Sequence, residues 1–208
     1  MKLYKPNKSV KGSALSINFS AKTDKEGIKG DKSFYFQLVS QTGWDDKSGN
    51  GTFKDGKKII VKFAPHEISG IIAAIRKNIS LADTMNVKYV YHNNDATATN
   101  ITFEPHFKSE KQGENWVKTN VQNGFIFRVT KTDKNNEQNK DTISIGFTWA
   151  EVELLRAVLE NGLVHISDSW YSENINRGSK NKEKLKQASK VEEQPVKESE
   201  PISEEADF

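Results

Sequence analysis

The chain has 208 residues, which allows one domain of about 170 residues followed by a tail. It contains no cysteine, and this excludes disulfides, thiolate zinc sites and cysteine nucleophiles. Hydrophobic residues make up only 35% of the chain and the net charge is +3, so part of the chain is expected to remain unpacked.

Seven stretches alternate apolar and polar residues in the way that is typical of half-buried strands. In the first of them, Leu15, Ile17 and Phe19 share one face. The predicted strands are 14–20, 33–39, 58–63, 87–91, 98–104, 124–129 and 142–147. Segments rich in Gly, Asn and Lys are predicted to be loops, namely 27–32, 45–56, 109–115 and 133–141.

Two segments carry the signals of helices. Pro65 suits the first position of a helix, and an apolar stripe follows it at helical spacing. The second helix is expected to begin with a capping box formed by Thr148 and Glu151. The pair Asn161-Gly162 is expected to end it.

The two helical segments resemble each other in sequence. Phe63 and Phe147 each end a predicted strand, Glu67 and Glu151 each open the following helix, and the members of both pairs lie 84 residues apart. The chain therefore reads as a duplicated unit of several antiparallel strands followed by one helix. The alternative is two unrelated transitions from strand to helix.

The segment 177–208 is rich in Lys, Glu, Ser and Gln and offers little apolar area, so it is expected to be a disordered tail behind a domain that spans 1–176. Its charge changes sign along its length. Residues 177–190 contain six basic residues and one acidic residue, whereas 191–208 contain seven acidic residues and one basic residue.

The order of these elements, together with the segment Lys11-Gly12-Ser13-Ala14-Leu15, resembles the Whirly family of single-stranded DNA-binding proteins over roughly residues 9–165. The resemblance implies an α+β fold with two antiparallel four-stranded sheets packed together, each half closed by a helix. The two repeats would span about 9–80 and 86–165.

The family resemblance also implies a homo-oligomer, a tetramer or a dimer, in which helices join the subunits and single strands run along the sheet edges. Ser13 stands where the family signature has a second Lys, a position that bears on higher assembly in that family. Related duplicated folds bind guide RNA, and a single unit serves a transcriptional coactivator. RNA binding or annealing and transcription regulation therefore stay open as alternatives.

A sequence-tolerant binder of single strands needs cations along the phosphate path and flat rings on which bases stack. The candidates in the first half are Lys11, Phe34, Phe36, Trp44, Lys54, Lys57 and Lys58. Those in the second half are Lys88, Tyr89, Tyr91, Phe107, Lys108, Trp116, Lys118, Arg128 and Lys131. Phenylalanines in strands are more often core residues, and lysines on a sheet are often only solvated.

The end of the chain resembles the acidic tails with a terminal aromatic residue of bacterial and phage single-stranded DNA-binding proteins. We expect such a tail to recruit replication or repair enzymes, and the alternative is a tail that only aids solubility. The expected partner-binding residues are Glu204, Glu205, Asp207 and Phe208. The function expected from the sequence is thus the coating of single-stranded DNA in DNA replication, recombination and repair.

Catalysis is not expected. The four histidines have no metal-ligand spacing, and no glycine motif that cradles phosphate is present. Asp45 and Asp46 lie in a polar loop where acidic residues are usually solvated. We therefore expect no metal, no cofactor and no enzymatic activity. The N-terminus lacks an apolar signal core, which favours the cytoplasm of a bacterial or phage-infected cell.

Overall fold

The structure is a computed structural model that describes residues 1–21 and 31–192. Ten strands and three helices make up the described chain. The strands are β1 (Lys2–Lys5), β2 (Ser13–Ala21), β3 (Lys32–Ser40), β4 (Gly43–Asp45), β5 (Asn50–Thr52), β6 (Lys58–Phe63), β7 (Val90–Asn93), β8 (Thr97–Gln112), β9 (Asn115–Asp133) and β10 (Asn136–Phe147). The helices are α1 (Pro65–Lys77), α2 (Leu81–Thr84) and α3 (Trp149–Glu192).

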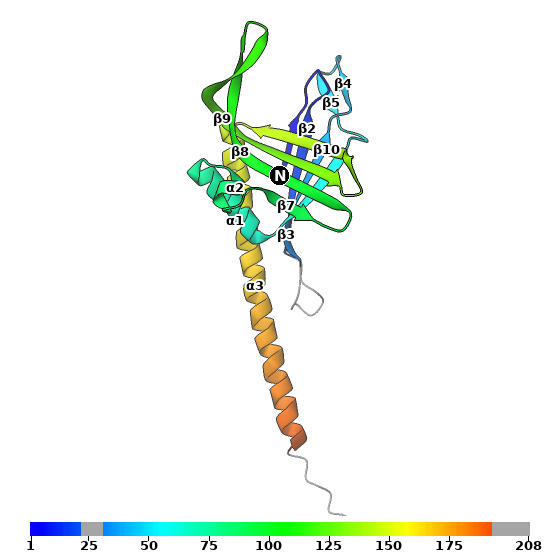
Figure 1. The fold of residues 1–208 in the computed structure, drawn as a ribbon. Helices are drawn as coiled ribbons and strands as arrows, with labels where there is room; N and C mark the ends of the chain where they lie inside the picture. Colours follow the sequence, from blue (N-terminus) through cyan, green and yellow to red (C-terminus); the bar gives the residue numbers. More distant parts are fainter. Residues whose placement is uncertain (22–30, 193–208) are drawn as a thin grey trace, which may run out of the picture.

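Two antiparallel four-stranded sheets form the body of the molecule (Figure 1). The first has the strand order β1-β2-β3-β6 and is followed by α1. The second has the order β10-β9-β8-β7 and is followed by α3. A small β4–β5 hairpin is inserted between β3 and β6. The predicted α+β class, with its two similar halves each closed by a helix, is therefore confirmed.

The core lies between the two sheets and is rich in phenylalanine. The Phe36 ring contacts Phe63 of its own sheet, with ring centroids 4.8 Å apart, and Phe127 of the other sheet, with centroids 5.5 Å apart. Seven phenylalanines are buried, namely Phe34, Phe36, Phe63, Phe103, Phe125, Phe127 and Phe147. Burying each such ring contributes about 1.5–3 kcal/mol, so these rings fix how the sheets face each other.

The two strand-to-helix transitions are built in the same way. The Glu67 carboxylate accepts a hydrogen bond of 2.8 Å from the Ala64 N–H, and the Glu151 carboxylate accepts one of 2.8 Å from the Thr148 N–H. Each bond satisfies an amide at a helix N-terminus. The equivalence that the sequence predicts is thus present in the hydrogen bonding.

The hydrogen bonds of Glu67 change its titration. Burial acts to raise the pKa of the Glu67 carboxyl, but the hydrogen bond shared with His92, at 2.6 Å, and the bond from the Ala64 N–H outweigh burial and lower that pKa. Because His92 belongs to β7, this carboxylate also ties α1 to the second sheet.

Several elements differ from the sequence prediction. The segments 109–115 and 133–141, predicted to be loops, belong mostly to long strands joined by tight turns. The strands β1, β4 and β5 were not predicted, and β7 begins at Val90 rather than at residue 87. The reason is that strands of three or four residues offer too short an alternation of apolar and polar residues to be recognised.

The helix α3 does not end at Gly162, so that part of the prediction is wrong. A Cβ atom on residue 162 would lie 2.5 Å from Cε1 of Phe34, and glycine therefore lets the helix approach the first sheet. The helix continues to Glu192, which differs from the expected start of disorder at residue 177, because Lys, Glu, Gln and Ala favour helix there. Residues 193–208 lie outside the described ranges. Across 1–21 and 31–192, no helix combines the length and the apolar character needed to cross a membrane.

The close approach at Gly162 can be tested by substitution. Gly162→Ala is expected to lower the free energy of unfolding by about 1–3 kcal/mol, because the added methyl group overpacks the contact with Phe34. In Gly178→Ala, the matched control in the same helix, the added Cβ meets nothing within 4 Å. This control should leave stability unchanged or raise it by up to about 1 kcal/mol. Urea unfolding followed by tryptophan fluorescence measures both, and equal stabilities would contradict the packing role.

Candidate nucleic-acid interface

Because the inner faces of the sheets form the core, ligands can reach only the outer faces and the hairpins. On the outer face of the second sheet, Tyr89 and Tyr91 are 48% and 50% exposed, and their ring centroids lie 5.6 Å apart. The Lys88 Nζ lies 5.2 Å from the centroid of the Tyr89 ring. Arg128, on β9, is exposed and pairs with Thr102 of β8. We call Lys88, Tyr89, Tyr91 and Arg128 the tyrosine cluster.

A hollow of about 360 Å³ adjoins the tyrosine cluster between α2 and β8. Lys88 and Tyr89 form part of its lining, together with Asn100 and Thr102 of β8. The Oδ1 atom of Asn100 and the Oγ1 atom of Thr102 are buried and have no hydrogen-bond partner among the described residues. One exposed ring, one cation and polar groups thus meet at this hollow, whose lining also includes the acidic residues Asp83 and Glu104.

The outer face of the first sheet presents a second hollow, of about 500 Å³. It is lined in part by Lys2 and Tyr4 from β1, Gln37 from β3, and Phe53 from the turn after β5. The rings of Tyr4 and Phe53 have centroids 5.8 Å apart. Rings beside a lysine therefore recur on this face.

Beyond the sheets, β8 and β9 continue as a two-stranded ribbon, which we call the β8–β9 arm and which comprises residues 107–122 (Figure 1). On the arm, the Lys118 Nζ lies 4.6 Å from the centroid of the Phe107 ring. Trp116 lies near the tip and is 71% exposed. The predicted candidates Lys108 and Lys118 are also exposed there.

Solved structures with this arrangement were found by comparison of the folds. The chain aligns with "Crystal Structure of WHY3 from Arabidopsis thaliana" at a TM-score of 0.53 and 16% identity, covering 83% of this chain and 89% of that chain. It aligns with "Structure of the plant transcriptional regulator PBF-2" at a TM-score of 0.54 and 15% identity, covering 84% and 85%. It aligns with WHY1 from Arabidopsis thaliana at a TM-score of 0.53 and 16% identity, covering 86% of this chain and 91% of that chain.

The fold is that of the Whirly proteins. At these identities the likeness establishes the fold, as the sequence resemblance predicted. Comparisons with known protein families and with curated sequences gave no match.

Within this Whirly fold, two predicted binding residues are misplaced. Phe34 and Phe36 are 0% and 2% exposed and belong to the core, so stacking of bases on their rings is excluded and the prediction is wrong for both. Trp44, on β4, is half-buried, and its indole N–H has no partner among the described residues. It is therefore less accessible than the sequence suggested.

The remaining predicted lysines lie at the surface but are dispersed over the fold. Lys11 and Lys54 occupy exposed loops, and Lys58 is exposed on β6. Lys57 forms an ion pair with Asp141, which joins the two halves. Lys131, on β9, lines a hollow of about 190 Å³ beside β6 and β7. The predicted tail residues 204–208 lie outside the described ranges.

Several surface residues of the first sheet were not predicted as binding candidates. Lys2 and Tyr4 belong to β1, and their only signal is the short alternation around Leu3. On β3 and β6, Tyr35 and Lys62 lie side by side, with the Lys62 Nζ 5.7 Å from the Tyr35 ring centroid. A hydrogen bond from the Tyr35 hydroxyl, aided by the Lys62 ammonium, lowers the pKa of Asp31 to about 2. This carboxylate stays charged and partly neutralises the lysine.

No group of three or more His, Asp or Glu side chains within the described part of the chain could hold a metal ion. The ionisable groups with shifted pKa values take part in ion pairs, helix caps or local hydrogen bonds: Glu67 and Glu151 are caps, and Asp45 accepts hydrogen bonds within its own turn. The arrangement of the surface therefore favours binding by stacking and charge.

Proposed function

We propose that this chain binds single-stranded nucleic acid, with DNA as its main ligand, and that it catalyses no reaction. The tyrosine cluster carries the proposal. Two half-exposed tyrosine rings, with Lys88 beside them and Arg128 two strands away on the same face, offer stacking faces and phosphate partners on one open surface. Base stacking on aromatic rings is sequence-tolerant because every base has a flat face.

The fold supports this proposal independently of the tyrosine cluster. The sequence of the chain resembles a family of single-stranded DNA-binding proteins. The fold of the chain matches solved structures that include a plant transcriptional regulator. We infer single-strand coating in replication, recombination or repair as the first function. Transcription regulation is the second candidate, favoured by the likeness to PBF-2. RNA binding on the same surface is the remaining alternative, and competition with oligo-rU tests it.

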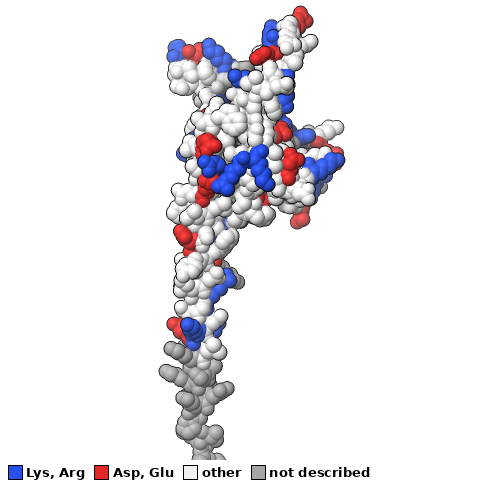
Figure 2. All heavy atoms as spheres, turned by 90° about the vertical axis from the view of Figure 1, so that its left-hand side faces the viewer, with Lys and Arg blue, Asp and Glu red and all other residues white. Residues whose placement is uncertain are grey.

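We propose further that the chain works as a homo-oligomer joined through its helices. A hollow of about 390 Å³ lies between α1 and α3, lined by the apolar residues Ile72, Ala73 and Leu163 and rimmed by the ion pair of Arg76 with Glu160. Figure 2 shows this side of the molecule, where charged residues of both signs cross the middle and uncharged surface lies above and below. Such a surface suits association of copies better than it suits an anionic polymer.

The acidic segment at the end of the sequence is proposed to recruit replication or repair enzymes through Glu204, Glu205, Asp207 and Phe208. Support comes from its composition, in which acidic residues precede an aromatic residue that can serve as an anchor. Deleting residues 198–208 should leave strand binding intact while abolishing capture of a partner enzyme.

Binding itself is tested by titrating fluorescent oligo-dT with the full chain and competing with oligo-rU of equal length. We expect submicromolar affinity that falls with salt, with a log–log slope of about −0.7 for each phosphate neutralised. The melting temperature should rise when oligo-dT is added, because a ligand of the native state stabilises it. Affinity that is absent or insensitive to salt would refute the proposal, and preference for oligo-rU would make RNA the ligand.

A further inference from the structure

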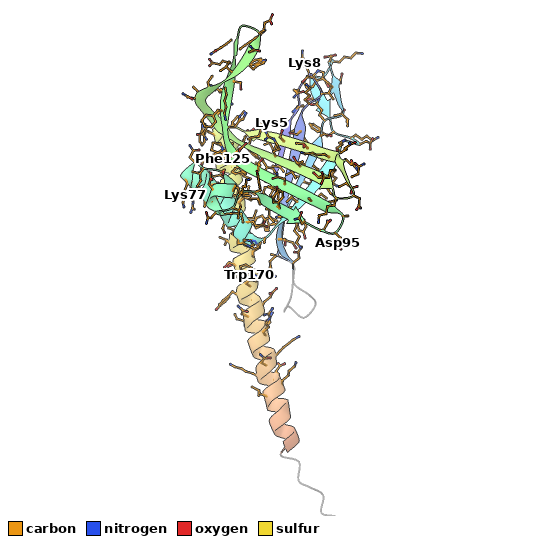
Figure 3. The ribbon with its side chains drawn as sticks, viewed as in Figure 1. Lys5, Lys8, Lys77, Asp95, Phe125 and Trp170 are labelled. Carbon is orange, nitrogen blue, oxygen red and sulfur yellow. The ribbon has the colours of Figure 1, made fainter. Side chains whose placement is uncertain are left out.

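The β8–β9 arm stands apart from both sheets. β7 pairs with β8 only as far as Ile101, and β10 pairs with β9 only from Phe125 onward. Among the described residues, those between Phe107 and Gln122 therefore have only each other as strand neighbours. In Figure 3 the arm rises above Phe125, which marks the point where β9 enters the sheet.

The pairing register divides the side chains of the arm between two faces. Ser109 pairs with Lys118 and Lys111 pairs with Trp116, so these four residues share one face. Phe107 joins them, because the Lys118 Nζ lies over its ring. We call Phe107, Ser109, Lys111, Trp116 and Lys118 the arm face.

The acidic residues of the arm lie elsewhere. Glu110 pairs with Val117 on the opposite face, and Glu114 occupies the turn. Among the described residues of the arm, the arm face thus combines two rings and two lysines with no carboxylate. A lysine is paired with or placed over each ring.

This separation indicates what kind of ligand fits the arm face. A two-stranded ribbon outside a sheet is marginally stable by itself, and a tryptophan 71% exposed near its tip adds no packing to it. The centres of protein–protein interfaces are depleted in lysine, whereas single-strand binders combine lysines with stacking rings. Beside Phe107 there is also a hollow of about 260 Å³ lined by Lys118, Thr119 and Asn120, where an amide can meet the edge of a base.

We propose that the arm face is an outlying binding element for the same single-stranded polynucleotide, where Trp116 stacks on a base and Lys111 and Lys118 contact phosphates. The inference rests on the proposed function of the body. It adds that the bound strand extends past the sheet onto the arm, so that long oligonucleotides reach a stacking ring and two cations that short ones do not.

The test compares Trp116→Ala with Val117→Ala, a control on the opposite face of the same ribbon, in the full chain. Affinity is measured for a series of dT oligonucleotides from about 8 to about 30 nucleotides, which runs from within the usual size of a single-strand site, about 4–16 nucleotides, to well beyond it. We expect Trp116→Ala to weaken binding of the longest oligonucleotides about fivefold or more, the lower end of what one stacked base contributes. Its affinity for the shortest should equal that of the wild type, and Val117→Ala should match the wild type throughout.

A second variant, Lys111→Gln with Lys118→Gln, tests the charges separately. For long oligonucleotides, the magnitude of its salt slope should fall by about 0.7 for each phosphate that the variant no longer neutralises. If the wild type binds strongly and both arm variants bind equally well at every length, the arm inference fails while the function of the body stands. Absence of binding by the wild type would contradict both the arm inference and the proposed function of the body. A change in the mass of Trp116→Ala by light scattering without DNA would assign the arm to the association of copies and overturn the inference.

Discussion

Replacing Tyr89, Tyr91 and Arg128 together by alanine should weaken the binding of oligo-dT about 100-fold or more. Each ring that loses a stacked base removes about 1–3 kcal/mol of binding free energy, and the removal of Arg128 takes away a cation for the phosphates as well. All three side chains are exposed, so the fold should be preserved. Fluorescence anisotropy at one fixed salt concentration measures the change.

Two controls separate stacking from other effects of the tyrosine cluster. The pair Tyr89→Phe and Tyr91→Phe keeps both rings and should retain nearly the affinity of the wild type. Tyr171→Ala removes a tyrosine that is exposed on α3, outside the tyrosine cluster, and should leave affinity unchanged. If the triple variant loses less than about threefold, stacking on these rings does not carry the binding.

Replacing Glu173 by leucine should lower the free energy of unfolding by about 3–5 kcal/mol. Its carboxylate forms an ion pair of 2.5 Å with Lys32 of β3, and the two side chains are only 6% and 8% exposed. The single substitution leaves the Lys32 ammonium buried without this partner, and burying a charge in that way is costly. Chemical denaturation at neutral pH, with enough denaturant points to define the slope, gives the value.

The double variant Lys32→Met with Glu173→Leu tests whether the cost comes from removing only one charge of the ion pair. Two apolar side chains of similar size should restore most of the stability, because a buried ion pair often contributes little compared with well-packed apolar residues. A double variant as unstable as the single one would show instead that the geometry of the pair is what holds α3 on the first sheet.

Local periodicity explains why much of the fold could be predicted. In β3 and β6, alternate residues face the core, so each strand can be predicted from its own sequence. The capping carboxylates Glu67 and Glu151 carry a local signal that also revealed the duplication. The arm has exposed side chains on both faces and therefore lacks alternation, and Gly162 looked like a helix end because its contact with Phe34 is distant in sequence.

The candidate site was predictable to a smaller extent. Tyr89, Tyr91 and Arg128 could be proposed from residue type, and the structure places them together on one outer face. Phe34 and Phe36 were misassigned although they alternate with polar residues and share a face with other apolar side chains of β3. Residue type suggested binding, whereas the shared apolar face should have indicated the core. The hollow around Tyr4 depends on β1, a strand too short to detect.

Each closing helix contacts the sheet of the other half as well as its own sheet. Glu67, at the start of α1, binds His92 of the second sheet, whereas α3 packs on the first sheet, where His165 stacks on Phe19 at 5.7 Å and Ser169 donates to the Ala21 carbonyl. Neither repeat therefore keeps all of its packing in isolation, because a lone first repeat would lose the contact of α3 with the buried Phe34. A severed first half could regain this cover only from the α3 helix of another molecule.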